Sequence, residues 1–312
     1  METPRGGMRL SVVVCTYNRS GSLRVTLKSL AQLAVPNGMN WELLVVDNNS
    51  TDSTRDAIQA FAAERTVPVR YVFEKRQGLS FARNAGIGRA RGEIVAFTDD
   101  DVTVDRMWLA RISEAFEGCG CAGVGGRVLP VWESAKPEWL SVAGPCRTNA
   151  VVSVDFGEQP GRLKGWAAGA NMAFRRDVFE RFGEFRTDLG RSGGNLMSGE
   201  DSEFSSRLVK AGEFLMYAPE AVVYHPVTAD RLKKSYFREW YFQNGRTVFR
   251  MDGAPRDARR YWGIPRYLFR QCASYVLTWW LSAAADKRFY YQLQTCQVLG
   301  MMAEARRMRA DA

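Results

Sequence analysis

Between residues 10 and 101, short β-branched runs alternate with amphipathic stretches, and this alternation constrains the fold more than any other feature. Apolar runs predict buried strands at 10–15, 43–46, 69–73 and 94–97. The stretches between them carry apolar residues at helical spacing, as at Leu23, Leu27 and Leu30. Strands and helices that alternate at this spacing indicate an α/β fold with a mostly parallel, Rossmann-like sheet and helices on both faces.

Polar residues follow the predicted strands at the points where they end. Thr16 and Tyr17 follow the first strand, Asp47 closes the second, and residues 75–78 and 99–101 follow the third and fourth. In parallel sheets, ligands bind beyond the carboxyl ends of the strands. We therefore expect the binding site at this edge.

The composition divides the chain near residue 225. Residues 1–225 hold 27 basic and 27 acidic side chains, whereas 226–312 hold 16 basic and 7 acidic ones. We predict a catalytic domain over 1–225, with halves at about 8–101 and 102–225, followed by a basic helical segment over 226–312. Further strands are expected at 123–131, 151–156, 214–217 and 221–224.

The basic segment has two interpretations that the sequence leaves open. Its excess charge favours phosphate-bearing partners, either nucleic acid or an anionic membrane surface, but a solvated face needs no partner. An apolar stretch at 267–285 contains Trp279 and Trp280 but is interrupted by Arg270 and Gln271. The uninterrupted apolar part after Gln271 is shorter than the roughly 20 residues that a spanning helix needs. It suits either a membrane interface or packing against protein.

Cysteine usage bears on the compartment. The six cysteines form no CxxC pair and the chain has one histidine, which argues against a zinc finger. Reduced thiols are expected, because a disulfide framework is unusual at this length. The first apolar run is too short for a signal peptide core. These features predict a cytoplasmic protein, with peripheral contact to the membrane as an open option.

Three consecutive carboxylates, Asp99, Asp100 and Asp101, directly follow a predicted strand. Carboxylates this close repel one another unless a cation neutralises them. Their oxygens suit Mg²⁺ or Mn²⁺, ions that proteins commonly hold together with substrate phosphates. The alternative is an exposed acidic turn.

Other residues have a functional and a structural interpretation. Asp47 suits a base or ribose but is also typical of an Asx turn, and Tyr17 suits base stacking or plain packing. Arg76 and Arg83 supply cations near the same edge or are surface charges. Glu200 and Asp201 start a predicted helix, where a carboxylate serves as general base or as a cap. The single histidine, His225, is a metal ligand or a structural residue.

Taken together, these residues resemble glycosyltransferase family 2, whose members have the GT-A fold. The resemblance covers about residues 10–225 and rests on six segments in family order. They are SVVVCTYNR at 11–19, LLVVDNNSTD at 43–52, GLSFARNAGI at 78–87, GEIVAFTDDD at 92–101, GWAAGANMAFR at 165–175 and GED at 199–201. The ordered set is specific, although each segment alone is weak.

The resemblance implies a role for each matching residue. Thr16, Tyr17 and Asp47 would hold the nucleoside, and Gly169 and Asn171 would lie beside the donor sugar. Asp99 would contact the ribose or the metal, Asp101 would coordinate the metal, and His225 matches a late metal-binding histidine. Asp201 would be the base, with Glu200 beside it. Arg83 and Asp100 are placed on the donor side, and Asp99 and Asp101 are favoured as the DxD pair.

The implied activity is inverting transfer of a sugar from a nucleotide diphosphate donor to an acceptor hydroxyl, in polysaccharide or glycoconjugate synthesis. A divalent metal, Mn²⁺ or Mg²⁺, is the expected cofactor. The acceptor is a carbohydrate or a lipid-linked sugar, with peripheral membrane contact through 226–312, and no nucleic acid is expected. The alternatives are a sugar nucleotidyltransferase and a basic-tailed nucleic-acid-binding protein. The first would want a glycine-rich loop after the first strand, which residues 16–20 lack.

Overall fold

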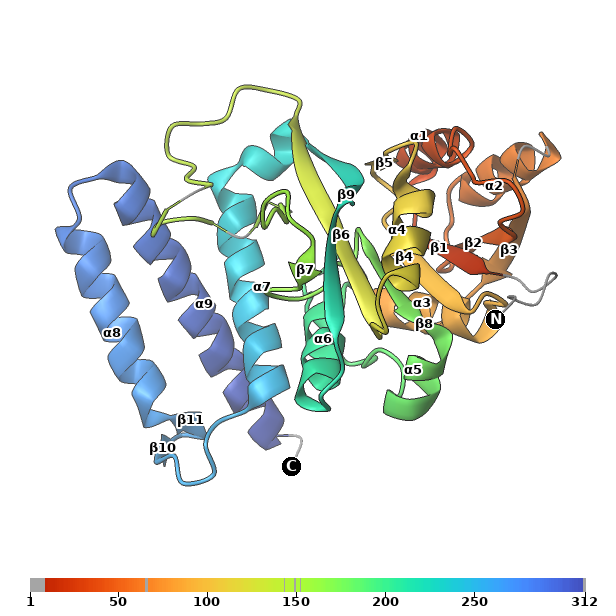
Figure 1. The fold of residues 1–312 in the computed structure, drawn as a ribbon. Coiled ribbons are helices and arrows are strands. Elements are labelled where there is room, and N and C mark those ends of the chain that lie inside the picture. The colour runs from red at the N-terminus through yellow and green to blue at the C-terminus, as the bar shows by residue number, and fades with distance from the viewer. Residues whose placement is uncertain (1–8, 65–66, 143, 149, 152, 311–312) are drawn as a thin grey trace. The chain divides into compact units, whose positions relative to one another are not determined.

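The chain divides into two compact units in the computed structural model, which describes residues 9–64, 67–142, 144–148, 150–151 and 153–310 (Figure 1). The sheet unit consists of Met1–Val131, Ser153–Asp188 and Glu200–Pro226. The helical unit consists of Trp132–Val152, Leu189–Gly199 and Val227–Ala312. The boundary expected after residue 225 lies beside the last of these segments. The sequence did not indicate that 132–152 and 189–199 cluster with the C-terminal helices.

Four parallel strands form the first half of the sheet, in the order β3-β2-β1-β4. Thr16 pairs with Asp47 and Val14 with Thr98, so the strands end near one another, as the sequence predicted. Helices follow the first three strands. The bounds are β1 (Leu10–Thr16), α1 (Ser20–Leu30), β2 (Trp41–Asp47), α2 (Thr54–Ala63), β3 (Val69–Phe73), α3 (Leu79–Arg89) and β4 (Ile94–Thr98).

The second half of the sheet is antiparallel. β8 pairs with β4 and β6, while β9 pairs with the short strands β5 and β7. The bounds are β5 (Thr103–Val104), α4 (Trp108–Glu117), β6 (Gly123–Trp132), β7 (Gly161–Arg162), β8 (Met172–Arg175), α5 (Arg176–Phe182), α6 (Glu200–Lys210) and β9 (Leu215–Val227).

Two predictions about strands in this half are wrong. The pair expected at 214–217 and 221–224 is one continuous strand, β9. The strand expected at 151–156 is reduced to an isolated bridge between Val154 and Val128, and its residue 152 lies outside the described residues.

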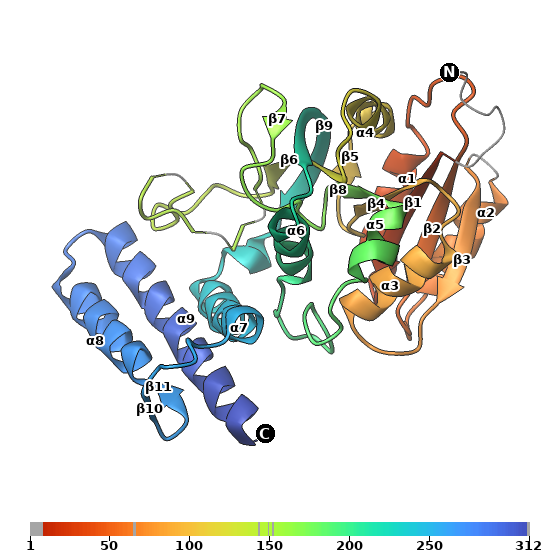
Figure 2. The ribbon, with the colours of Figure 1, turned by 60° about the horizontal axis from the view of Figure 1, so that its bottom comes forward.

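β1, β2 and β4 are covered on both faces, because nearly all their side chains are buried. Val13, Leu44 and Phe97 face a core that also contains residues of α3, α5 and α6. Figures 1 and 2 show α1 and α2 on the opposite face. The predicted arrangement of helices on both faces is confirmed.

Three helices dominate the helical unit: α7 (Lys234–Asp252), α8 (Arg266–Leu281) and α9 (Ala285–Ala310). A Cβ on Gly245 would lie 1.9 Å from the carbonyl oxygen of Gln297, and one on Gly300 equally close to that of Phe242. Glycine at both places therefore lets α7 and α9 approach closely. A 3₁₀ turn (Ala229–Leu232) precedes α7, and a hairpin of β10 (Arg260–Tyr261) and β11 (Ile264–Pro265) precedes α8.

Part of the basic charge of this unit is neutralised internally. The fully buried Glu304 accepts hydrogen bonds from Arg246, Arg250 and Arg307. Burial alone would raise the pKa of Glu304, but these three arginines outweigh it and lower the pKa. Three of the cations counted in the basic segment therefore serve packing.

Two further observations bear on the sequence analysis. The structure pairs Cys119 with Cys121 in a disulfide, so the expectation of reduced thiols is wrong for this pair. Within the described residues, no helix has both the length and the apolarity needed to cross a membrane.

Candidate active site

The end of β2 is built around two buried side chains, Asp47 and Asn48. Asp47 accepts hydrogen bonds from the Ser50 amide at 2.9 Å and from the Tyr71 hydroxyl at 2.9 Å. Burial and the bond to Asp47 raise the pKa of Tyr71 to about 12, so this hydroxyl stays a donor. The Asn48 oxygen accepts from the Gly78 amide at 2.8 Å, which ties this loop to the start of α3.

The acid cluster follows β4, as predicted, and the protein supplies one of its counter-ions. Arg19 Nη1 lies 3.1 Å from carboxylate oxygens of both Asp100 and Asp101. Burial raises the pKa of Asp100 to about 6, against the attraction of Arg19. Asp99 is the most exposed of the three, with 31% of its side chain accessible. The alternative interpretation of these residues as an exposed acidic turn is therefore wrong, because all three side chains are mostly buried.

Strand pairing brings His225 to the cluster from more than a hundred residues away. β5 follows the acids directly and pairs Thr103 with Tyr224 of β9. The register leaves His225 Nε2 3.5 Å from Asp101 Oδ1. One ligand atom each from Asp99, Asp101 and His225 all lie within 4.8 Å of one another.

The two ring nitrogens of His225 face different groups. Nδ1 lies 3.1 Å from the carbonyl oxygen of Pro226, which can only accept. If Nδ1 donates to this oxygen, Nε2 is the nitrogen that a metal on the Asp101 side would bind. Metal-bound histidines are commonly oriented by such a bond to a backbone carbonyl. Two carboxylates and a neutral imidazole form a donor set that suits Mn²⁺ or Mg²⁺.

Arg83 lies at the centre of the site instead of on the surface. Its side chain is 3% exposed and forms an ion pair with Glu200, and Nη2 lies 3.6 Å from Asp99. Burial raises the pKa of Glu200, although Arg83 opposes this rise. A Cβ on Gly169 would lie 2.2 Å from Arg83 Nη2, so glycine is needed for this approach. Arg76, in contrast, is an exposed charge that pairs with Glu74.

The carboxylate of Asp201 is held from two sides. Oδ2 accepts the Gly169 amide at 2.9 Å, and Oδ1 accepts the Ser202 amide at 2.7 Å. Because Gly169 also borders Arg83, and Arg83 contacts Asp99, Asp201 lies on the same side of the sheet unit as the acid cluster. Asp201 is half-buried and its orientation is fixed.

Asn171 is fully engaged by protein groups. Its oxygen accepts the Trp108 indole N–H at 2.8 Å, and its nitrogen donates to the carbonyls of Arg127 and Ala221 at 2.8 Å each. It is 1% exposed and joins α4, β6 and β9. Thr16 is also buried, whereas Tyr17 is 38% exposed at the same edge.

The sequence analysis assigned no role to Arg19, Tyr71 or Ser202. Arg19 had a weak signal, because it ends the segment 16–19 that follows the first strand. Tyr71 reaches Asp47 from the neighbouring strand β3, and Ser202 reaches Asp201 as the next residue in the chain. No sequence motif indicates either contact.

Comparison with known proteins identifies the family of this chain. The sequence model described as Glycosyl transferase family 2 matches residues 11–183. Succinoglycan biosynthesis protein ExoM of Rhizobium meliloti is 30% identical over 92% of this chain and 90% of its own length. A glucosyl-dolichyl phosphate glucuronosyltransferase of Haloferax volcanii is 31% identical over 70% of this chain and 69% of its own length.

Solved structures with the same fold include two complexes with nucleotide sugars. The mannosyltransferase PcManGT from Pyrobaculum calidifontis, in complex with GDP-Man and Mn²⁺, matches with a TM-score of 0.57 and 21% identity, over 99% of this chain and 77% of its own. S. aureus TarS 1-349, in complex with UDP-GlcNAc, matches with a TM-score of 0.57 and 15% identity, over 92% and 90%. The prediction of a GT-A fold is confirmed.

Proposed function

The chain belongs to glycosyltransferase family 2, and from this premise we propose that it transfers a sugar, with inversion, from a nucleoside diphosphate donor to an acceptor hydroxyl. The observation that carries the proposal is the convergence of Asp99, Asp101 and His225 at the edge where Asp201 is held. Because the chain belongs to this family, we set aside the two alternatives, a sugar nucleotidyltransferase and a nucleic-acid-binding protein.

The donor set fits a divalent cation. Asp99, Asp101 and His225 would hold it, and the excess of carboxyl groups over the two guanidinium groups of Arg19 and Arg83 leaves negative charge for it to balance. Bound there, Mn²⁺ or Mg²⁺ would stabilise the charge on the departing diphosphate. The Mn²⁺ in the complex of PcManGT supports this choice of ion.

The residues at the end of β2 suit the nucleoside. Asp47 is held by Tyr71 and Ser50 and offers oxygens of fixed position to a base or ribose. Tyr17 is exposed enough to stack on the base, while the buried Thr16 supports the turn. Asp100 accepts a hydrogen bond from Arg19, and Asn171 bonds protein groups such as the Trp108 indole. We therefore assign both a structural role in the site.

Asp201 is the proposed general base. The amides of Gly169 and Ser202 orient its carboxylate, which takes the proton of the acceptor hydroxyl as that oxygen bonds to the anomeric carbon. The bond from that carbon to the diphosphate breaks in the same step, so configuration inverts without a covalent intermediate. Glu200 pairs with Arg83 and positions it against Asp99.

The test uses a panel of nucleotide sugars, including GDP-mannose, UDP-glucose and UDP-GlcNAc. We expect the protein to release nucleoside diphosphate from at least one of them in a Mn²⁺-dependent way. Asp101→Ala should lose Mn²⁺-dependent donor binding, whereas Asp201→Asn should bind donor but fail to transfer. Full transfer by Asp201→Asn, or no Mn²⁺-assisted binding of any donor by the wild type, contradicts the proposal.

The acceptor is proposed to be a growing polysaccharide or a lipid-linked sugar. The names of two relatives support this class, because one is a succinoglycan biosynthesis protein and the other a glucosyl-dolichyl phosphate glucuronosyltransferase. A cytoplasmic location stays a prediction from the sequence, and the Cys119–Cys121 disulfide removes part of its support.

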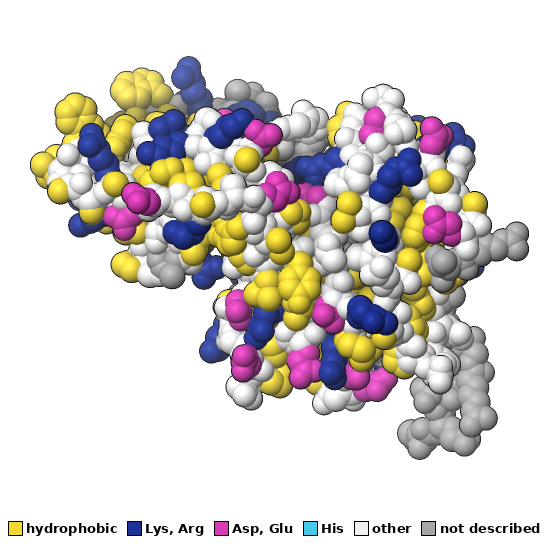
Figure 3. Space-filling model, turned by 90° about the horizontal axis from the view of Figure 1, so that it is seen from above, with side chains coloured by type: hydrophobic (Ala, Val, Ile, Leu, Met, Phe, Trp, Pro, Cys, Tyr) yellow, Lys and Arg dark blue, Asp and Glu magenta, His cyan; other side chains and the backbone are white. Residues whose placement is uncertain are grey.

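Peripheral membrane contact through the helical unit is also part of the proposal. Leu277, Trp280 and Leu281 of α8 are 60–76% exposed, and Arg266 and Arg270 lie on the same face of this helix. Figure 3 shows apolar side chains beside Lys and Arg on this unit, at the left of the view. Apolar and basic side chains together suit an anionic membrane interface.

Sedimentation with anionic vesicles at low salt tests this contact. Trp280→Ser with Leu281→Ser should release the protein, while the exposed Val25→Ser in α1 should not. Wild-type protein that does not sediment with the vesicles contradicts the membrane contact, but this result does not bear on the transfer reaction.

A further inference from the structure

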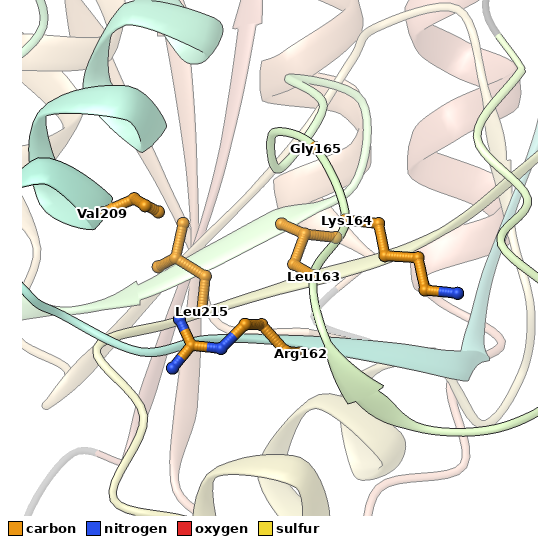
Figure 4. Close-up of a pocket in the computed structure, with 6 residues that line it drawn as sticks. All are labelled: Arg162, Leu163, Lys164, Gly165, Val209 and Leu215. Atoms are coloured by element: carbon orange, nitrogen blue, oxygen red, sulfur yellow. The ribbon is translucent and has the colours of Figure 1, made fainter.

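A groove runs along one side of α6 in the sheet unit. It consists of two adjoining cavities of about 340 and 390 Å³, which share Gly165 and Val209 as lining residues. Figure 4 shows the first, between the segment 162–165, Val209 of α6 and Leu215 of β9. The second continues along α6 past Trp166, Ser202 and Ser206. Between Ser202 and Lys210, eight positions further along, an α-helix rises about 12 Å.

One lining residue of the groove, Ser202, contacts the carboxylate proposed as the base. The segment 165–169 runs alongside α6, because the Gly169 amide bonds Asp201 at 2.9 Å and the Ala167 amide bonds Ser205 Oγ at 3.2 Å. Ser202 lines the groove and also donates its amide and hydroxyl to Asp201. A molecule lying in the groove can therefore contact Ser202, whose hydroxyl lies 3.3 Å from Asp201 Oδ1.

The lining combines apolar and hydroxyl groups in a particular order. Trp166 is 44% exposed and Val209 is 46% exposed, so both offer apolar surface to a ligand. Ser202 and Ser206 are one helical turn apart on the same side of α6. A pyranose ring is matched to such a lining, because one of its faces is made of C–H groups and its rim carries hydroxyls. Aromatic side chains bind such amphipathic rings with little loss of conformational freedom.

The far end of the groove is cationic. Arg162 and Lys164 line the first cavity and Lys210 lines the second, and all three side chains are exposed. Glu200 and Asp201 begin α6 and Lys210 ends it, so acidic and basic residues lie at opposite ends of this helix. An elongated ligand with a neutral hydroxyl at one end and an anionic group at the other fits this arrangement.

We propose that this groove is the acceptor subsite and that it takes a hexopyranose bearing an anionic group. Trp166 stacks on the ring, Ser202 and Ser206 bond its hydroxyls, and the anionic group, a phosphate or a carboxylate, lies against Arg162, Lys164 and Lys210. The sugar hydroxyl nearest Ser202 then faces Asp201. This inference rests on the proposed function, since it gives the proposed base its substrate.

Indole NMR of the full chain tests the subsite directly. With ¹⁵N-labelled tryptophan, the signal of Trp166 is the one of nine that Trp166→Phe removes. The probes are the methyl glycosides of glucose, galactose and mannose, together with glucose 1-phosphate. We expect at least one probe to shift the Trp166 signal selectively, and Trp166→Ala to weaken its binding at least about tenfold.

Matched variants separate stacking from charge. Trp166→Tyr should retain binding within about threefold, because tyrosine offers the same flat surface. Lys164→Ala should weaken glucose 1-phosphate several-fold but leave the methyl glycosides unchanged. Lys28→Ala removes an exposed cation from α1 and should change neither. An unshifted Trp166 signal with all four probes, or unaltered binding by Trp166→Ala, overturns the proposal.

A donor assay on the same samples distinguishes this proposal from the proposed function. Lys28→Ala should release nucleoside diphosphate from the donor with Mn²⁺ as the wild type does, because Lys28 lies outside the donor and acceptor residues. If the wild type releases none while the Trp166 signal shifts, the groove binds sugar and the transfer reaction is wrong. If donor release is normal and the Trp166 signal stays fixed, only the acceptor subsite is wrong.

Discussion

Replacing Arg83 by methionine measures the free energy that depends on its buried pair with Glu200. Only 3% of the Arg83 side chain and 5% of that of Glu200 are exposed, so water cannot take over the lost partner. Removing one member of such a pair costs roughly 3–5 kcal/mol, because it leaves an uncompensated buried charge. At roughly 2–4 °C per kcal/mol, the melting temperature of the sheet unit should fall by roughly 6–20 °C at pH 8. Asp99 adds less, because it is 31% exposed.

The loss should depend on pH in a defined direction. Burial already raises the pKa of Glu200, and removing the opposing attraction of Arg83 raises it further. A carboxyl group whose folded pKa is raised contributes stability below its unfolded pKa and loses it as the pH rises through the folded pKa. The variant should therefore be close to wild type near pH 4.5 and fall increasingly behind toward pH 8.

Calorimetry at pH 5, 6.5 and 8 on four proteins tests this reasoning. They are the wild type, Arg83→Met, Glu200→Gln and the double variant. The double variant should recover most of the stability lost by Arg83→Met, because it no longer buries an unpaired charge. The reasoning is refuted if the deficit of Arg83→Met is the same at pH 5 and pH 8, or if the double variant melts as low as the single one.

Three further predictions follow from the contacts at the site. His225→Gln should weaken Mn²⁺ binding at least about tenfold by calorimetric titration, and unchanged affinity would remove His225 from the metal site. Gly169→Ala should lower the rate of transfer more than tenfold, because its Cβ would meet Arg83 at 2.2 Å; Gly88→Ala in α3, with open space around it, should keep the wild-type rate and gain up to about 1 kcal/mol of stability. Asn171→Ala should lower the free energy of unfolding by about 2–5 kcal/mol in urea, because it strands the Trp108 indole and two carbonyls; a change below about 0.5 kcal/mol would contradict the buried network.

The parallel half of the fold was predictable because three of its four strands, β1, β2 and β4, are buried on both faces. Such strands appear in the sequence as short continuous apolar runs, and the helices between them keep a clear apolar face. The bounds expected for β3, residues 69–73, agree with the structure.

The antiparallel half was less predictable, and β9 shows why. The sequence analysis expected two strands, at 214–217 and 221–224, on either side of Pro219. In the structure, β7 pairs with Met216 and Tyr217, and β5 pairs with Val223 and Tyr224. Pro219 falls between these two pairings, where no partner on that side requires its missing N–H. Pairings of this kind depend on short distant strands that leave little signal in the sequence.

Within the site, the positions of residues were easier to predict than their contacts. The acids at the ends of β2 and β4 lie where the sequence predicted, because paired parallel strands end at the same edge of the sheet. The partners that orient them, Arg19 and Tyr71, depend on side-chain packing between different elements. The motif around Asn171 likewise does not reveal that its amide faces the protein instead of the donor.

Hydrogen exchange in the ladder between β5 and β9 should report whether the metal site is occupied, without any substrate. β5 has two residues, and the Asp105 amide continues the ladder to the Val222 carbonyl at 3.0 Å. So short an edge strand opens readily, which lets its amide protons exchange with solvent. An ion held by Asp101 and His225 spans the same junction, so each opening would have to release it. Deuterium uptake at Thr103–Val104 and Asp105 should then slow as Mn²⁺ is added.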